Sequence, residues 1–416
     1  MKLLSLIIPL IFSATTVFGL DLVQMQKMAL ENREVIQRYV TKLEQSEKDI
    51  IRAKGLYYPS VDIGYTANSL DEGSLIEESE NSVATGRISW NIFSGFRDKY
   101  NLQSAEKQKE VEQYRLQGIE QDIQLDVALA YLLVYERLAN RKVAESAFET
   151  LQKVYGDGEN RFQVGLIGKN ELLKFRVDYD NADITLKAAN AGLEKSLNVL
   201  ARQVGSPIGF DALDFADFSE LPPQIDREEY TQKMLAERSE IKTLEAVIEA
   251  NDARAKAELG GYYPQVDIAG IYRKYDDDYI NGSGSVEDDE LRAQMVLSMN
   301  LFRGFTTEAT VARAKLETRA IQYELDELKN SLLTELNNLY IDFEVSFENV
   351  EIANRSIEQA EENLRITQLK YDEGLQRESD LLDAITSLSR AQYNYVAVIR
   401  TLFLNDFSLT RMIGGF

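Results

Sequence analysis

Two long stretches of this chain place apolar residues at spacings of three and four, which predicts amphipathic helices. The first stretch has apolar side chains at Leu116, Ile119, Ile123, Val127, Ala130, Val134 and Leu138. The second has them 209 residues later, at Leu325, Leu328, Leu332, Leu336, Leu339, Phe343 and Phe347. This is an eleven-residue repeat of about 3.67 residues per turn, which does not impose the left-handed supercoil of a heptad. We therefore expect long helices that run nearly straight beside one another. An ordinary amphipathic helix is the alternative interpretation.

Two other regions alternate apolar and polar residues with a period of two, which predicts β-hairpins. The first hairpin covers about residues 57–93, and one face of its first strand carries Val61, Ile63, Tyr65 and Ala67. The second covers about residues 262–302, and its second strand carries Ala293, Met295, Leu297, Met299 and Leu301. Strands of about ten residues with one apolar face are typical of membrane β-barrels, and a half-buried soluble hairpin is the alternative.

Four strands are too few to close a barrel, which needs at least about eight. Lipid does not tolerate the open edge of a sheet, because the unpaired backbone groups have no water to bind. We therefore expect several copies of the chain to pool their hairpins.

Hairpins and helices belong to a tandem repeat. The segment 88–96, ISWNIFSGF, is matched by 297–305, LSMNLFRGF, and 161–166, RFQVGL, is matched by 370–375, KYDEGL. Both matches have an offset of 209. The distance along the chain from Phe93 to Gly165 is therefore 72 residues, and so is the distance from Phe302 to Gly374. As one helix, 72 residues would span roughly 108 Å at about 1.5 Å per residue. Loops drift in length, so the equal spacing indicates a rigid element whose length matters for function.

The prolines mark the joints between these elements, because proline breaks a helix interior. Pro59 and Pro264 open the two hairpins, and Pro207, Pro222 and Pro223 share one linker. We divide the chain into a leader (1–19), a first repeat (20–204), an equatorial linker (205–226) and a second repeat (227–416). Each repeat is expected to hold a helix, a hairpin, a long helix, a tip turn (about 156–170 or 370–380) and a return helix. The shorter helices are predicted at 21–54, 170–202, 227–259 and 379–410.

The first residues are typical of a secretory signal. Lys2 supplies the positive charge, residues 3–12 the apolar run, and residues 17–19 a small-residue cleavage site. The apolar run is too short to cross a bilayer as a helix, which favours a cleaved leader over a membrane anchor. No other segment approaches about 18 consecutive apolar residues, so no transmembrane helix is expected.

Composition argues against several functions. The chain contains no cysteine and no histidine, which removes thiol nucleophiles, structural zinc and the commonest general base. Glycine-rich phosphate loops are also absent from the sequence. We therefore expect no enzyme activity, no metal site and no cofactor. The net charge of -23 argues against nucleic acid as a partner. The hairpin tips, 70–81 and 276–290, are acidic; solvated outer loops are the favoured interpretation and divalent-cation binding is the alternative.

Taken together, these residues resemble the TolC-like outer-membrane efflux and secretion ducts over the whole mature chain. The resemblance rests on the Tyr-Tyr-Pro strand entries, the Phe-x-Gly-Phe strand exits and two helix-turn motifs, RFQVGLIGKNELL at 161–173 and KYDEGLQRESDLLDA at 370–384. It implies a homotrimer with one twelve-stranded β-barrel in the outer membrane, continued by a helical barrel across the periplasm of a Gram-negative envelope. It also implies a periplasmic adaptor (membrane fusion) protein and an inner-membrane pump as partners, in an efflux or type I secretion system.

The resemblance assigns roles to residues at the periplasmic tip. Asp380 and Asp383 hold the positions of the acids that line the tunnel constriction, where three-fold symmetry would gather six carboxylates and favour cations. For Asp380 the alternative is a helix cap.

The resemblance also implies a latch that holds the tip shut. Tyr371 and Glu171 match its two sides, and its arginine would fall at Gln376, with Arg377 one residue on. Docking of the adaptor is implied at the two turns, for Val164, Gly165, Leu166, Gly374 and Leu375.

Two other classes of protein share part of this pattern. A trimeric coiled-coil surface adhesin, or another structural envelope protein, would carry heptads and one membrane domain at the C-terminus. A soluble periplasmic coiled-coil adaptor would lack the ten-residue alternating strands. The two mid-chain hairpins therefore favour a passive exit duct.

Overall fold

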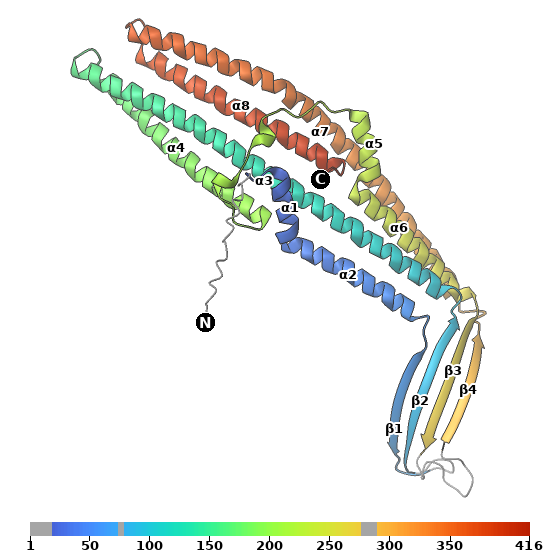
Figure 1. The fold of residues 1–416 in the computed structure, drawn as a ribbon. Helices are drawn as coiled ribbons and strands as arrows, with labels where there is room; N and C mark the ends of the chain where they lie inside the picture. Colours follow the sequence, from blue (N-terminus) through green and yellow to red (C-terminus); the bar gives the residue numbers. More distant parts are fainter. Residues whose placement is uncertain (1–18, 74–78, 276–288) are drawn as a thin grey trace, which may run out of the picture. The chain divides into compact units, whose positions relative to one another are not determined.

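The computed structural model describes residues 19–73, 79–275 and 289–416 of this 416-residue chain. The leader up to residue 18 and the central parts of both acidic hairpin tips lie outside these residues, as do our predictions for them. The described chain is mostly helical with one small antiparallel sheet, which confirms the predicted class (Figure 1).

Contacts divide the chain into two compact units. One holds the described residues up to Ile36, then Ile119–Met234 and Thr334–Phe416. The other holds Gln37–Gly118 and Leu235–Leu333, including the sheet.

The two longest helices, α3 (Arg97–Gln163) and α7 (Thr306–Asp372), have 67 residues each. Their first residues are 209 apart, and so are their last. None of the fourteen apolar side chains of the eleven-residue pattern is exposed, and Val127, Val134 and Leu336 are almost fully buried. The pattern therefore marks the face on which each long helix packs.

Both long helices begin after the same unusual backbone. Gly95 and Phe96 precede α3 with φ values of 68° and 67°, and Gly304 and Phe305 precede α7 with 57° and 64°. A phenylalanine in the left-handed region is uncommon, because its β-carbon crowds the backbone. Each one packs edge-on against the phenylalanine three residues before it, Phe93 or Phe302, with ring centroids 5.1 Å apart in the first copy and 5.4 Å in the second. The Phe-x-Gly-Phe motif thus specifies the sharp change from strand to helix.

Two helices that the sequence predicts as continuous are broken, so those predictions were wrong. The segment 21–54 divides into α1 (Leu22–Asn32) and α2 (Glu34–Gly55). The segment 227–259 divides into α5 (Arg227–Glu237) and α6 (Ser239–Glu258), followed by the 3-10 helix η3 (Leu259–Tyr262). The residues at the breaks, Arg33 and Arg238, have extended backbones with ψ values of 121° and 120°.

A tertiary contact explains the first break. The Arg33 guanidinium donates to the Gln203 carbonyl at 3.1 Å and also to the Gln203 side-chain oxygen. Next to it, Asn32 packs against Gly205, where an added β-carbon would lie 2.9 Å from Asn32 Cβ. Gly205 has φ 75° and ends α4 (Lys169–Val204). The chain therefore leaves α1 where it reaches the end of α4, which local propensity does not reveal.

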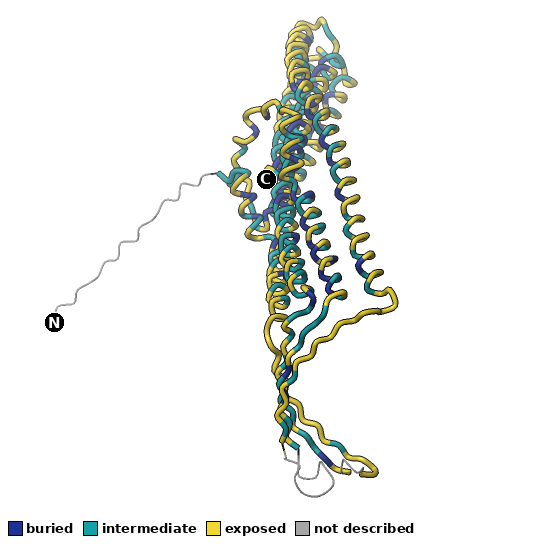
Figure 2. Tube along the Cα trace, turned by 90° about the vertical axis from the view of Figure 1, so that its right-hand side faces the viewer, coloured by how far each residue is buried: buried dark blue, intermediate teal, exposed yellow. Residues whose placement is uncertain are grey.

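The sheet contains β1 (Ser60–Ser69), β2 (Glu80–Phe93), β3 (Gln265–Tyr275) and β4 (Asp289–Ser298). All neighbours are antiparallel, in the order β1-β2-β3-β4. The fourth strand ends before Met299 and Leu301, which we had assigned to it. Much of the sheet is exposed in this single chain, as Figure 2 shows. The exposed residues include apolar ones: Ile63 is 90% exposed and Leu291 is 82% exposed.

The equatorial linker contains two 3-10 helices, η1 (Phe210–Ala212) and η2 (Ala216–Phe218), and packs its aromatic rings on α3 and α8 (Glu378–Met412). Tyr131 of α3 stacks on Phe215 with ring centroids 5.1 Å apart. Phe218 lies edge-on to Phe403 of α8 at 4.9 Å. Among the helices that the structure describes, none has both the length and the apolar composition needed to cross a bilayer.

Candidate functional site at the helix turns

The two long helices end in matching turns. After α3, Leu166 donates its N–H to the Arg161 carbonyl at 2.9 Å and Gly165 donates to Phe162 at 3.0 Å. After α7, the equivalent bonds join Leu375 to Lys370 at 2.8 Å and Gly374 to Tyr371 at 3.0 Å. Both glycines are left-handed, with φ values of 78° and 71°. These are Schellman motifs, and they explain why glycine stands at both positions.

The apolar residues beside these glycines have no cover in the single chain. Val164 is 71% exposed, Leu166 is 75% exposed and Leu375 is 79% exposed. All of the residues that we predicted to dock an adaptor therefore lie at the two turns, in positions that another molecule can reach.

Two of the predicted site acids begin the return helices. The Glu171 carboxylate accepts a hydrogen bond from the Gly168 N–H at 3.2 Å, at the start of α4. The Asp380 carboxylate accepts one from the Arg377 N–H at 3.3 Å, at the start of α8. Glu171 and Asp380 are 209 residues apart, so they are the same capping acid in the two repeats. The capping role that we gave as the alternative for Asp380 is therefore present in the structure.

Tyr371 lies among rings and charges from three helices. Its ring is edge-on to Phe175 of α4 with centroids 6.2 Å apart, and the Arg161 guanidinium of α3 lies 4.8 Å from its centre. Burial raises the pKa of the Tyr371 phenol, Arg161 opposes this, and the Glu171 carboxylate adds to it. Within the described residues of one chain, Glu171 acts on this phenol through its charge, without a hydrogen bond between them.

Within one chain, two ion pairs join the first repeat to the second near the helix turns. Arg161 of α3 pairs with Asp372 of α7 at 2.9 Å. Lys174 of α4 pairs with Glu378 of α8 at 2.7 Å, and the Glu378 side chain is only 12% exposed. The Lys174 ammonium holds the pKa of the Glu378 carboxyl below its usual range. Each pair thus connects helices of the first repeat to helices of the second.

An apolar cluster underlies these contacts. Val154 of α3, Phe175 of α4, and Leu381 and Ile385 of α8 are all buried. Phe175 approaches α3 closely at Gly158, where an added β-carbon would come within 2.8 Å of its ring. The cluster fixes the separation of α3, α4 and α8, and so positions the polar groups around it.

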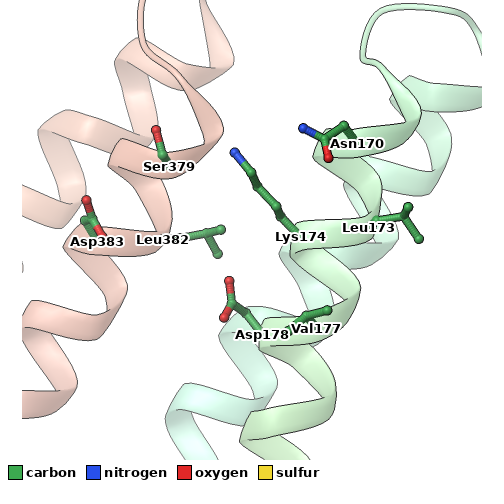
Figure 3. A pocket seen from close by; sticks show the side chains of 8 residues that line it. All are labelled: Asn170, Leu173, Lys174, Val177, Asp178, Ser379, Leu382 and Asp383. Atoms are coloured by element: carbon green, nitrogen blue, oxygen red, sulfur yellow. The ribbon is translucent and has the colours of Figure 1, made fainter.

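Between α4 and α8 lies an open cleft of about 460 Å³ (Figure 3). Its lining is Asn170, Leu173, Lys174, Val177, Asp178, Ser379, Leu382 and Asp383. Asp178 of α4 points into the cleft, and Asp383 of α8 lines it as well. Burial raises the pKa of the Asp178 carboxyl, and the nearby charge of Asp383 adds to that effect. The cleft therefore has an acidic pair that includes one of the predicted constriction residues.

Comparison with known proteins identifies the family. The outer membrane efflux protein family matches residues 26–206 and 230–415, which is most of the chain. The chain belongs to this family. It is 20% identical over 400 residues to the outer membrane protein TolC of Escherichia coli K12, covering 90% of this chain and 80% of that protein. It is 21% identical over 418 residues to TolC of Vibrio cholerae, covering 95% and 94%.

Solved structures have the same fold. The outer membrane protein VceC from Vibrio cholerae superposes with a TM-score of 0.78 at 18% identity, covering 95% of this chain and 96% of that one. The resemblance seen in the sequence is thereby confirmed, and the efflux family places this chain in the outer membrane of a Gram-negative envelope. The match decides against the adhesin and the soluble adaptor.

Sequence reasoning missed Arg161, Lys174, Asp178 and Glu378. A signal for Lys174 was present in the repeat, because Lys174 is 209 residues before Asp383. Positions that face each other across a pair of repeats tend to have equivalent numbers, and Asn170 and Leu173 likewise face Ser379 and Leu382 in the cleft. For Asp178 the sequence held no comparable signal, because its repeat equivalent is Ser387.

Proposed function

We propose that this outer membrane efflux protein is the passive exit duct of a tripartite efflux pump or type I secretion system, working as a homotrimer that is gated at its helix turns. The observation that supports a trimer is the four-stranded sheet with its two open edges. β1 and β4 each have one neighbouring strand within the described chain, so each leaves an edge of unpaired backbone groups. In lipid such edges have to be paired, and three chains of four strands supply one closed barrel of twelve.

The apolar strand side chains support the same arrangement. Ile63, Leu291 and Leu297 are more than two-thirds exposed in a single chain, which is unfavourable in water but suits contact with outer-membrane lipid. The repeats assigned from the sequence, 20–204 and 227–416, would then each contribute one hairpin to the barrel, and one long helix with its shorter neighbours to the tunnel. The exposed turns would meet the adaptor, and the inner-membrane pump would select the cargo.

Proline substitution in β1 should test whether the barrel closes. Adjacent residues of a strand direct their N–H groups to opposite neighbours, so only one of Asp62→Pro and Ile63→Pro removes a bond to β2. If β1 pairs with another chain, both variants lose a ladder bond, and both should dissociate the trimer in mild detergent. Native mass measurement of the purified protein checks this result.

Alanine at the same two positions is the matched control and should leave the trimer intact. If β1 is a free edge, one proline variant should behave like its alanine control. That outcome, or a stable monomer of the parent protein, would contradict the closed barrel.

We infer that the gate is held by several links at the tip. The family latch implied for Tyr371, Glu171 and Arg377 remains part of this proposal. The structure supports a further link within each chain, the ion pair of Lys174 with Glu378, because it joins α4 of the first repeat to α8 of the second. Separation of those two helices would have to break it.

Charge reversal should show whether this ion pair holds the tip shut. Lys174→Glu and Glu378→Lys each place like charges together, so each variant should raise the single-channel conductance several-fold. The double variant restores an opposite pair and should return the conductance toward that of the parent. Lys187 forms an ion pair with Asp183 one turn away on the same helix, α4, so the Lys187→Glu variant is a control that should conduct like the parent. Equal conductance in all four variants and the parent would remove this pair from the gate.

A further inference from the structure

The residue predicted to begin the mature chain is bound to the equatorial linker. The Leu20 N–H donates to the Ala212 carbonyl at 2.6 Å, and the Asp214 N–H donates to the Leu20 carbonyl at 3.2 Å. One residue earlier, Gly19 lies directly against Asp214; a β-carbon at Gly19 would come within 2.7 Å of Asp214 Cβ. The fold therefore fixes the chain at the peptide bond where the sequence predicts cleavage of the leader.

Three carboxylates belong to the two segments that meet here, and Asp214 and Asp217 are exposed. Asp21 accepts a hydrogen bond from the Gln24 N–H at 2.8 Å and so caps α1. Asp217 accepts from the Leu22 N–H at 3.2 Å, and Asp214 accepts from the Ala216 N–H at 3.1 Å. In the part of the chain that the structure describes, no lysine or arginine forms an ion pair with any of the three. Their negative charge is thus concentrated without a side-chain cation.

A buried phenol packs on the same linker, because the Tyr131 ring stacks on Phe215. Tyr131 is 0% exposed, and its hydroxyl has no hydrogen-bond partner among the described residues. Burial raises its pKa, and the charges of Asp217, Asp214 and Asp21 raise it further, so all three act on this one group. A buried hydroxyl without a partner is uncommon in a folded protein and indicates a group or water that completes the site.

We propose that the linker is a binding site for the chain's own N-terminal ammonium, which forms when the leader is removed between Gly19 and Leu20. In that hydrolysis, catalysed by a signal peptidase, the oxygen of water bonds to the Gly19 carbonyl carbon and the C–N bond breaks. Gly19 leaves as a carboxylate, and the Leu20 nitrogen takes up both protons of the water to become an ammonium group.

The Leu20 ammonium formed by cleavage fits the site better than the uncleaved Gly19–Leu20 peptide bond does. One N–H donor becomes three, so the Ala212 carbonyl keeps its bond while further donors become available to neighbouring oxygens. The new positive charge lies among Asp21, Asp214 and Asp217, which supplies the missing cation. Loss of Gly19 also empties the space beside Asp214. Removal of the leader would therefore complete the contact between the N-terminus and the linker.

The reactivity of the N-terminal amine tests this proposal on the intact protein in detergent. Mass spectrometry should first show a chain that begins at Leu20. Acylation of the amine at pH 7 requires its neutral form, whose fraction falls about tenfold for each unit by which the carboxylates raise the amine pKa. We expect Asp214→Asn combined with Asp217→Asn to accelerate acylation about tenfold. Asp211→Asn, which removes an exposed charge of the same linker, should leave the rate unchanged.

A second variant leaves the linker intact, in case the double substitution impairs folding. Insertion of one alanine between Gly19 and Leu20 keeps the cleavage motif and moves the ammonium by up to about 3.6 Å. This variant should also be acylated faster than the parent. A chain that begins elsewhere, or equal rates in the parent, the double variant and the insertion variant, would overturn the proposal. Channel conductance is not part of this test, so its outcome is independent of the proposed function.

Discussion

Replacing Asp380 and Asp383 together with asparagine should abolish the block of the channel by multivalent cations and remove its cation preference. In the proposed trimer these residues contribute six carboxylates to one constriction. Charges held close together at a narrow, partly desolvated site interact strongly. We expect the affinity for a trivalent blocking cation to fall on the order of 100-fold, which corresponds to about 2.7 kcal/mol. Planar-bilayer recordings with salt gradients and added blocker measure both effects.

The structure shows how to separate charge from folding in this experiment. Asp380 caps α8 through the Arg377 N–H, so its substitution also weakens a helix start. Asp383 lines the cleft without that role, and Asp383→Asn alone should lose much of the block. Asp178→Asn removes the neighbouring acid of α4 and should add to the loss. Asp180→Asn removes a surface charge from the same helix and is the control. Unchanged selectivity in the Asp380 and Asp383 double variant would eliminate the ring.

Asp406→Asn should stabilise the protein at neutral and alkaline pH. Asp406 lies near the end of α8, and burial raises the pKa of its carboxyl from the ordinary 3.8 to about 6. Because the folded state holds this proton more tightly than the unfolded state, Asp406 makes the protein less stable as the pH rises from about 4 to about 6. Above that window the cost is complete, about 3 kcal/mol at 1.36 kcal/mol per pKa unit.

Thermal unfolding at several pH values checks this prediction. The midpoint of Asp406→Asn should exceed that of the parent at pH 8 and converge with it near pH 4. Tyr230 of α5 is the facing titratable group, since the Asp406 charge contributes to the raised pKa of its phenol. The exposed Asp342 of α7 provides the control, because Asp342→Asn should leave the midpoint unchanged at every pH. A gain for Asp406→Asn that is equal at pH 4 and pH 8 would contradict the role of burial.

The features that the sequence predicts well are those that repeat along it. The eleven-residue pattern of α3 and α7 and the period-two alternation of the strands are local, and the constant offset of 209 identifies the same elements twice. The turn glycines are likewise local, because a Schellman motif needs a left-handed residue at a fixed place.

What the sequence does not show depends on contacts between distant segments. The break at Arg33 arises because its guanidinium binds Gln203, 170 residues away. The pair of Lys174 with Glu378 joins residues 204 apart, and neither residue has an unusual local pattern. Asp178 becomes notable only because α8 brings Asp383 to the same cleft. Such pairings follow from how helices pack, which spacing within one helix cannot specify.

The equal length of α3 and α7 restricts how proteins of this kind can vary. One residue inserted into α3 alone would advance its turn by about 1.5 Å and rotate it by about 100° relative to the turn of α7. A change confined to one copy would therefore shift one turn along its helix and leave the other in place, so the turns would no longer be at equivalent positions of the two repeats. Eleven residues complete about three turns, so eleven added to both helices would restore every packing face. Viable lengths should thus differ in paired steps of roughly 16 Å, and the depth of envelope that such a protein spans would change in increments of that size.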